Sequence, residues 1–507
     1  MSNNGGPRRR DLAHDLFLPT LLFAALGGMT WAVRGCSGFG ALNGCVFAGV
    51  AWGAAWWFIA RDPGGQQSRR YASGWIILAL TVGIGLSGDR GWMQWPSFFN
   101  GRLQTNAQAG QWVPIPRLYG FIWLFIAGVP WAGIGACLLA WCGSGRPARA
   151  WQWALRLACG FGVSYAALFL FNHFPEFFMP LYKSLKAQYM DFGSNPNLRR
   201  LTNDNRAAIW HLGLYLGFVL FEAGRKDWKN VKLMLTVGIV NGLGWALWQN
   251  WQWAASVWPG ASFNFWRCWE SSGGISIGIA YGLAYYLVNG RMSEEEKARQ
   301  GRGLANGQLN LEWLAVYLGL LLATGLFFIG ELHGWWGAVY FGLSGAFGVG
   351  YYLLRRRLPE KGLAGPAWTC EDPNLERLGA YLGLLLGLGM SIRNGLKGWF
   401  NIYKGHEDYW DGVLWNMAGP LMLLGLLAIL AGILLRPLPR GFQGNAFPRA
   451  YRLIWLVLIV QNVIAQMITG PLSSWQEAAF SIYYLLLFCI SATILYHYHY
   501  LKVHNRE

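Results

Sequence analysis

The sequence predicts an all-α integral membrane protein, and three observations lead to that class. Hydrophobic residues make up 54% of the 507 positions and charged residues only 13%, whereas soluble domains are about one quarter charged. Glycine occurs 68 times and tryptophan 31 times, as expected where helices pack on small residues and aromatic side chains occupy membrane interfaces. Fourteen apolar stretches approach or reach the roughly 20 residues that cross a bilayer. This composition excludes a disordered chain, a nucleic-acid-binding domain and a disulfide-rich secreted scaffold.

The apolar stretches follow one another along the whole chain. They lie near 16–33, 39–60, 73–88, 118–142, 154–172, 207–222, 231–248, 273–289, 313–330, 335–354, 378–392, 413–435, 452–468 and 478–498. Those at 73–88, 207–222 and 378–392 are short, so each is also compatible with a re-entrant segment or a half-helix. Three arginines before the first stretch resemble a signal peptide, but no small-residue cleavage site ends the apolar run. We therefore interpret it as the first membrane span.

Basic residues predict the orientation. Taken in consecutive pairs, the stretches form seven helical hairpins, and 28 of the 41 Lys and Arg lie at the termini or between hairpins. Because cytoplasmic segments retain Lys and Arg, we expect an inner-membrane protein with both termini cytoplasmic. The net charge of +17 then reflects topology, with the lipid bilayer as partner and no nucleic acid. The prediction is one polytopic domain over 1–507, with hairpins near 11–61, 73–142, 154–224, 231–290, 311–355, 375–436 and 451–500.

An internal repeat supports the hairpin as the structural unit. At a spacing of 64 residues, thirteen of the 25 positions in 311–335 are identical in 375–399. A fixed period of this kind is typical of repeat architectures. Hairpins that all enter from the same side predict a ring or layered bundle, and argue against the inverted repeats of many secondary transporters. We expect the first helix of each hairpin to line the interior and the second to surround it.

Pairs of small residues four positions apart predict where helices touch. Such pairs let helix backbones approach closely inside a membrane. They include Gly49/Gly53, Gly238/Gly242, Gly278/Gly282 and Gly383/Gly387.

Polar and charged residues recur at the outer end of each hairpin's first helix. The candidate substrate-binding residues are Arg34, Asp89, Arg90, His173, Gln249, Asn250, Glu331, His333, Arg393 and Asn394. Ionisable groups at membrane depth are costly unless they face a cavity or each other, so we expect a shared outward-facing pocket. The alternative is that each residue lies at the interface and meets water or lipid head groups. Three arginines against two acids leave one positive charge in excess, which favours a small polar or anionic ligand.

Three outer segments, at 91–117, 174–206 and 394–412, are long enough to cover such a pocket. They show no periodicity, which is typical of lids and binding loops. Their aromatic residues could stack on a ligand, although an interfacial belt accounts for many of them as well.

Neither a cofactor nor a metal is expected. The eight cysteines show no CxxC pair and no Cys/His spacing, and Glu331 and His333 are two residues apart rather than four. Cys36 and Cys268 both map near the outer face, so a disulfide between them is one alternative. The segment 83–88 (GxGxxG) lacks the strand that a dinucleotide site needs, and we interpret it as a helix-packing segment. The segment 274–278 (GxSxG) lies inside an apolar stretch without the strand–turn–helix context of a nucleophile elbow.

Two functions from different classes follow. The first is a transporter of a small polar or anionic solute. The second is a membrane-embedded transferase or hydrolase that acts on a lipid-linked or glycan substrate at the outer face, with Asp89, Glu331, His173 and His333 as acid and base. A structural or accessory membrane component is a third. Transport needs a polar lining, and the inner halves of the helices are nearly all apolar; the sparse polar candidates are Thr81, Thr236, Asn241, Tyr317, Thr324 and Tyr381.

Overall fold

The computed structural model describes residues 11–36, 41–60, 69–88, 98, 101–143, 150–260, 263–290, 383, 387 and 475–504. Within these residues the chain is mostly helical, and six helices are long and apolar enough to cross a membrane. The protein is therefore a helical membrane protein, as predicted.

The helices and strands follow in chain order. They are η1 (Ala13–Phe17), α1 (Leu18–Cys36), α2 (Ala41–Ile59), α3 (Trp75–Ser87), β1 (Arg102–Asn106), β2 (Gln111–Pro114), α4 (Leu118–Gly143), α5 (Ala150–His173), α6 (Pro175–Phe178), α7 (Lys186–Met190), α8 (Pro196–Gly224), α9 (Trp228–Trp248), α10 (Trp251–Val257), α11 (Phe265–Val288) and α19 (Trp475–His504).

Nine of the fourteen predicted stretches coincide with helices, and the other five, between 313 and 468, lie outside the described residues apart from Gly383 and Gly387. The six candidate spans are Ala13–Ala32, Leu118–Gly143, Trp151–His173, Pro196–Gly224, Trp228–Trp248 and Ala478–Tyr498, with two shorter apolar helices at Gly44–Ile59 and Trp75–Ser87. Fourteen spans and seven hairpins are therefore not established. Cys268, at the start of α11, carries a free thiol, and the side chain of Cys36 lies outside the described residues.

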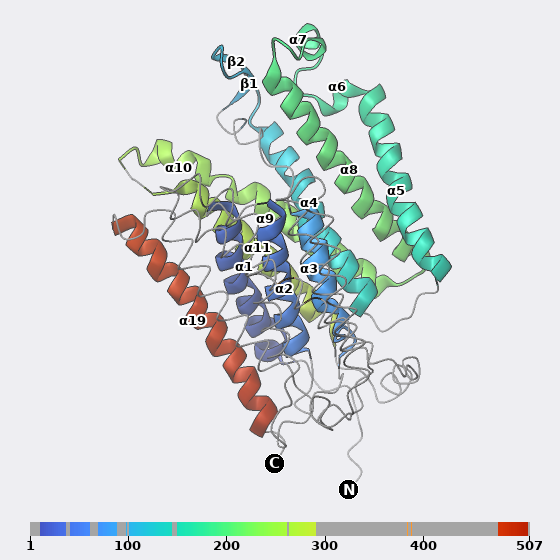
Figure 1. The fold of residues 1–507 in the computed structure, drawn as a ribbon, viewed down its shortest axis with the longest axis vertical. Helices are drawn as coiled ribbons and strands as arrows, with labels where there is room; N and C mark the ends of the chain where they lie inside the picture. Colours follow the sequence, from blue (N-terminus) through green and yellow to red (C-terminus); the bar gives the residue numbers. More distant parts are fainter. Residues whose placement is uncertain are drawn as a thin grey trace, which may run out of the picture.

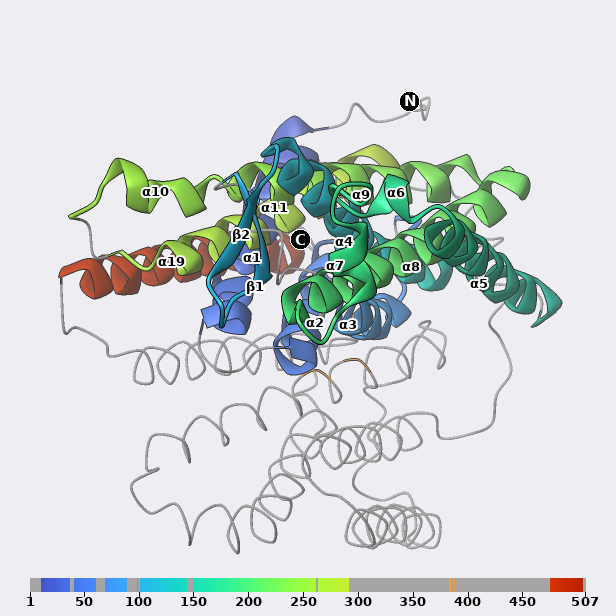
Figure 2. The same cartoon turned by 90° about the horizontal axis from the view of Figure 1, so that it is seen from above.

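Six of the helices form a closed ring. Each packs against the next in the order α1, α11, α9, α4, α3 and α2, and α2 returns to α1. Outside the ring, α19 packs on α1, while α8 packs on α4 and carries α5 on its outer side. Figures 1 and 2 accordingly show α19 and α5 at opposite edges of the described helices.

The bundle has two ends that differ in character (Figure 1). One end holds η1, the C-terminal end of α19 and the turn between α8 and α9. It includes Arg69, Arg225 and Lys226, and we call it the basic end. The other holds β1, β2, α7 and α10, and we call it the distal end.

The prediction that the first helix of each hairpin lines the interior and the second surrounds it does not hold for every hairpin. In α4, a second helix, 78% of the apolar window is buried inside the structure, against 22% in α5, a first helix. The prediction was wrong for this pair because α5 contacts mainly α8 and leaves its other faces to lipid, whereas α4 contacts helices on three sides.

The distal connections are more ordered than the sequence suggested. Within 91–117, β1 and β2 form an antiparallel hairpin whose turn contains Gly110 at φ +63°. Within 174–206, α6 and α7 precede α8, which begins eleven residues before the predicted stretch at 207. The hairpin docks on this second segment, because Asn106 Nδ2 donates to Ser194 O at 2.9 Å.

Glycines allow the closest helix contacts, as the small-residue pairs predicted. A Cβ on Gly27 of α1 would collide with the carbonyl group of Gly274 in α11, and one on Gly278 would collide with the backbone of Phe23. The same holds between Gly49 of α2 and the backbone of α3. In hydrocarbon, where apolar side chains gain nothing by leaving lipid, such backbone contact is a main source of helix association.

We predict that Gly274→Ala lowers the apparent free energy of unfolding in detergent by about 1–3 kcal/mol, because the new methyl group meets backbone that cannot move aside. Gly162→Ala in α5 is the matched control, since nothing lies within 4 Å of its Cβ position. That change should leave stability unchanged or raise it by up to about 1 kcal/mol. Equal losses at the two glycines would contradict the tight α1–α11 contact.

Candidate functional site

Three of the ten predicted site residues have described side chains: His173, Gln249 and Asn250. For Arg34 only the backbone is described, as part of α1, and Asp89, Arg90, Glu331, His333, Arg393 and Asn394 lie outside the described residues. The shared pocket of all ten therefore stays a prediction.

His173 ends α5 at the surface of the bundle. Its Nδ1 donates to Phe169 O at 2.9 Å and its ring stacks on Phe169 with centroids 3.9 Å apart. Because α5 packs on α8 and α6, whereas α9 packs on α4 and α11, the structure does not bring His173 beside Gln249.

Gln249 follows the last turn of α9 and is fully buried. Within the described part of the chain, neither its Oε1 nor its Nε2 has a hydrogen-bond partner. Its neighbour Asn250 is half-buried and uses Nδ2 to cap Leu247 O at 2.7 Å, while the Asn250 Oδ1 has no partner. A buried amide left in this way costs about 1–3 kcal/mol, which native proteins keep chiefly where a ligand or water completes the site.

A cluster of five buried tryptophans fills the ring one helical turn below Gln249. Trp245 is its centre, with ring centroids 4.3 Å from Trp131, 4.8 Å from Trp269 and 6.5 Å from Trp31. Trp31 in turn stacks on Trp52 at 6.1 Å. Five helices contribute to this tryptophan cluster, so it joins all the ring helices except α3.

Polar groups and aromatic rings lie together around Gln249. Trp245 and Gln249 are four residues apart, at positions where side chains on a helix are neighbours, and both are fully buried. The indole N–H groups of Trp245 and Trp269 also lack a hydrogen-bond partner among the described residues. The site therefore combines two indole N–H donors with an amide that both donates and accepts hydrogen bonds. The flat faces of the indoles can stack on a ring or hold a cation.

Buried amides continue along α9 at three depths. Asn230, Asn241 and Gln249 are each 1% exposed or less, and they span about 28 Å of the helix axis. Asn241 Nδ2 donates to Gly128 O of α4 at 2.6 Å, but within the described structure the Asn241 Oδ1 has no partner. We call these three residues the α9 amide face. Thr81, by contrast, is satisfied within its own helix, where its hydroxyl donates to Ile77 O at 2.6 Å.

At the basic end the α9 amide face enters a buried polar network. Asn230 Nδ2 donates to Glu222 Oε2 at 3.0 Å, and Arg156 Nε donates to Glu222 Oε1 at 2.8 Å. Tyr71 donates its hydroxyl to Asn230 Oδ1 at 2.7 Å. Arg156 is 1% exposed and lies against the faces of Trp141 and Trp153, with its guanidinium 5.0 and 4.7 Å from their centroids.

The network continues to the other edge of the bundle. Asn289, which caps α11, exchanges hydrogen bonds with the backbone of Tyr71 at 3.0 and 3.2 Å. Arg69 donates to Asn289 O at 2.8 Å and pairs with Asp15 at 2.5 Å. Burial, with the nearby Asp227 carboxylate, raises the pKa of Tyr71 above its usual value, so this hydroxyl stays a proton donor. We call this chain, from Arg156 to Asp15, the basic-end network.

Sequence reasoning missed two parts of the site. The inner half of the bundle was expected to be nearly all apolar, and that was wrong, because Glu222 closes a predicted stretch and Tyr71 precedes another. The start of α11 was also missed: its buried Arg267 and Glu270 flank Trp269, before the predicted start at 273. Each of the five clustered tryptophans lies close to a glycine-rich stretch, and this pattern is the signal that could have identified them. Tryptophans at a membrane interface show the same pattern, so the sequence does not separate the two.

No known protein family matches this chain, and neither the characterised proteins nor the solved structures contain a match. Within the described residues no group of three His, Cys, Asp or Glu side chains could hold a metal ion.

We predict that Gln249→Met raises the thermal stability of the purified protein, by the equivalent of about 1–3 kcal/mol, because it removes a buried amide without partners at similar volume. Asn230→Leu is the control, since both polar atoms of Asn230 are bonded, and it should lower stability. If Gln249→Met proves as destabilising as Asn230→Leu, then the Gln249 amide is a structural group.

A second prediction concerns the ion pair of Arg156 and Glu222. Replacing Glu222 with Gln removes the charge facing a buried guanidinium and should lower the apparent free energy of unfolding by about 3–5 kcal/mol. Changing Arg156→Met and Glu222→Leu together should recover part of that loss, because apolar groups of similar volume often replace such a pair without cost, while Asn230 Nδ2 and Arg225 still lose their carboxylate partner. An SDS titration of the parent, Arg156→Met, Glu222→Leu and the double variant measures the coupling, and purely additive losses would contradict it.

Proposed function

We propose that the protein transports a small polar solute, which it binds between Gln249 and the tryptophan cluster and passes along the α9 amide face. The observation that carries this proposal is the row of buried amides on α9, two of which have polar atoms without partners in the described structure. In the proposed orientation the basic end is cytoplasmic and the distal end opens outward.

A transport path differs from a simple helix-packing face because it has polar groups at several depths of the membrane. Asn230, Asn241 and Gln249 lie at three depths across the thickness of a bilayer. Hydrocarbon offers no other hydrogen-bond partner for their amides. All three are closed off from solvent here, which corresponds to an occluded state of the proposed cycle. Alternating exposure of such a site to the two sides is the general requirement of transport.

Two parts of the proposal rest on the sequence alone. These are the outward opening of the site and the positive bias that Arg34, Arg90 and Arg393 would give it, which extends the solutes to small anions. The alternative, a membrane-embedded transferase or hydrolase on a lipid-linked or glycan substrate, needs a site open only to the outer face. It also needs an acid and a base, and the described distal residues supply His173 alone of the four predicted ones.

Cysteine accessibility tests the path directly. In a variant without native cysteines, Asn241→Cys should react with a membrane-impermeant thiol reagent from either side of sealed vesicles, since alternating access exposes it to both. Gln249→Cys, at the proposed solute site itself, should likewise react from either side. Leu243→Cys is the control, because Leu243 is 59% exposed on the lipid-facing side of the same helix and should not react.

Uptake by proteoliposomes supplies the functional measurement. With a panel of labelled amino acids, sugars and carboxylates, Asn241→Leu should reduce uptake of any transported solute at least tenfold, whereas Leu243→Ala should not. An Asn241→Cys that no reagent reaches from either side would exclude the path. Labelling from the distal side only would favour the enzyme.

A further inference from the structure

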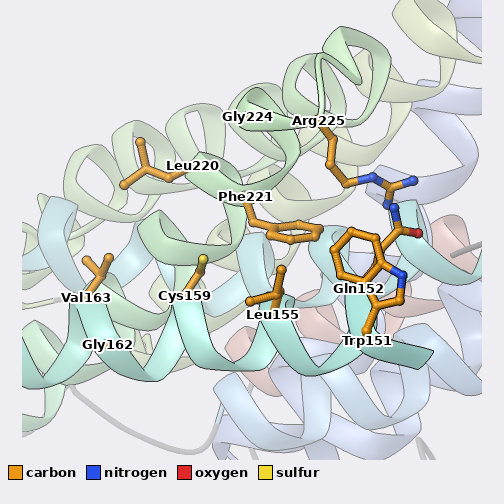
Figure 3. Close-up of a pocket in the computed structure, with 10 residues that line it drawn as sticks. All are labelled: Trp151, Gln152, Leu155, Cys159, Gly162, Val163, Leu220, Phe221, Gly224 and Arg225. Atoms are coloured by element: carbon orange, nitrogen blue, oxygen red, sulfur yellow. The ribbon is translucent and has the colours of Figure 1, made fainter. Parts of the chain in front are cut away.

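A groove runs between α5 and α8 (Figure 3), two helices that lie at one edge of the bundle (Figure 1) and do not include the residues of the proposed solute site. Its volume is about 570 Å³. The lining is Trp151, Gln152, Leu155, Cys159, Gly162, Val163, Leu220, Phe221, Gly224 and Arg225. Figure 3 shows Arg225 beside Gln152 and Trp151 at one end, with apolar residues and Gly162 at the other.

The groove faces the hydrocarbon of the membrane. On α5, Leu155, Phe161 and Phe169 are exposed on a candidate span, and lipid is the solvent that such side chains meet. Exposed Trp151 and Trp228 at the basic end mark the interface, where tryptophan is enriched. From Trp151 to Val163 the groove covers about 18 Å of helix, close to the hydrocarbon thickness of one leaflet.

Two glycines keep the groove open. Nothing lies within 4 Å of a Cβ built on Gly162 or on Gly224, although Gly160 and Gly217 nearby are in tight contact across the same pair of helices. The helices therefore touch at Gly160 and Gly217 and leave open space beside Gly162 and Gly224.

The mouth of the groove carries an unbalanced positive charge. Glu222 faces two guanidinium groups, Arg156 at 2.8 Å and Arg225 at 3.7 Å, so two positive charges meet one negative charge. When Lys226 and Asp227 are counted as well, three positive charges face two negative ones, which again leaves one positive charge in excess. The Nη1 atoms of Arg156 and Arg225 are buried, and within the described structure neither has a hydrogen-bond partner.

We propose that this groove binds an anionic phospholipid, with an acyl chain between α5 and α8 and the head-group phosphate on Arg225. An anion at the mouth supplies the missing negative charge and accepts hydrogen bonds from a guanidinium, which suits phosphate through paired contacts. The site lies on the lipid-facing side of α5 and α8 at the basic end and does not depend on the solute path.

Competition between lipids tests the proposal with the full-length protein. The protein is equilibrated in mixed micelles with equal amounts of dioleoyl phosphatidylglycerol and dioleoyl phosphatidylcholine, and the retained lipid is measured by mass spectrometry. The parent should retain the anionic lipid about fivefold over the zwitterionic one, the factor that one basic residue near the surface provides. Arg225→Gln should abolish this preference and Arg225→Lys should keep most of it. Lys232→Gln, an exposed basic residue on α9 outside the groove, is the matched control and should change nothing.

The acyl chain is tested separately. Gly162→Leu places a side chain in the groove from a position whose Cβ has no atom within 4 Å, and it should reduce retention of both lipids, whereas Gly162→Ala should have a much smaller effect. Equal retention of the two lipids by the parent would overturn the proposal. So would displacement of the lipid by millimolar inorganic phosphate with no effect of Gly162→Leu, which would indicate a phosphate site alone. A dimer that Gly162→Leu dissociates would assign the groove to a second copy of the chain instead.

Discussion

The backbone contact between α1 and α11 is the constraint on which the ring depends. Gly27 and Gly274 let the two helices approach until only hydrogen atoms separate them, and Ser271 then donates across the contact to Gly28 O at 2.9 Å. At any larger separation Trp31 and Trp245 would lose their contact, and the tryptophan cluster would no longer fill the ring. In a membrane this close packing replaces the hydrophobic effect that would hold a soluble core together.

The two ends of the bundle leave different buried polar groups without partners among the described residues, the Nη1 atoms of Arg156 and Arg225 at the basic end and the groups around Gln249 at the distal end. At the basic end most groups are bonded, from Glu222 through Asn230 and Tyr71 to Asn289, and this network joins α5 to η1 across the whole bundle. At the distal end Gln249 and two indole N–H groups are buried without partners among the described residues. A folded protein can keep a few buried polar groups without partners when its other polar groups are hydrogen-bonded. Such unsatisfied groups are expected at functional sites.

The sequence predicted the class, nine helices and several helix contacts, because apolar length and pairs of glycines determine these locally. It also proposed Gln249 as a site residue from its place at the end of a stretch, which stays a prediction. It could not show that Glu222 meets Arg156, since 66 residues separate them and only the packing of α8 on α5 brings them together. The β-hairpin at 102–114 was missed for a related reason: its strands are short, and only two inward positions, Leu103 and Thr105, repeat.

The ring also has a consequence for how the chain is made. Gly27 and Gly274 are 247 residues apart in sequence, so α1 enters the bilayer long before its main partner exists. At roughly 5–20 residues per second, the ribosome needs about 12–50 s to reach α11. Throughout that interval the glycine-lined face of α1 must be held by lipid or by the insertion machinery. Ring closure is therefore a late, post-insertion event, and delayed synthesis of α11 would leave the first helix open to capture by other membrane proteins.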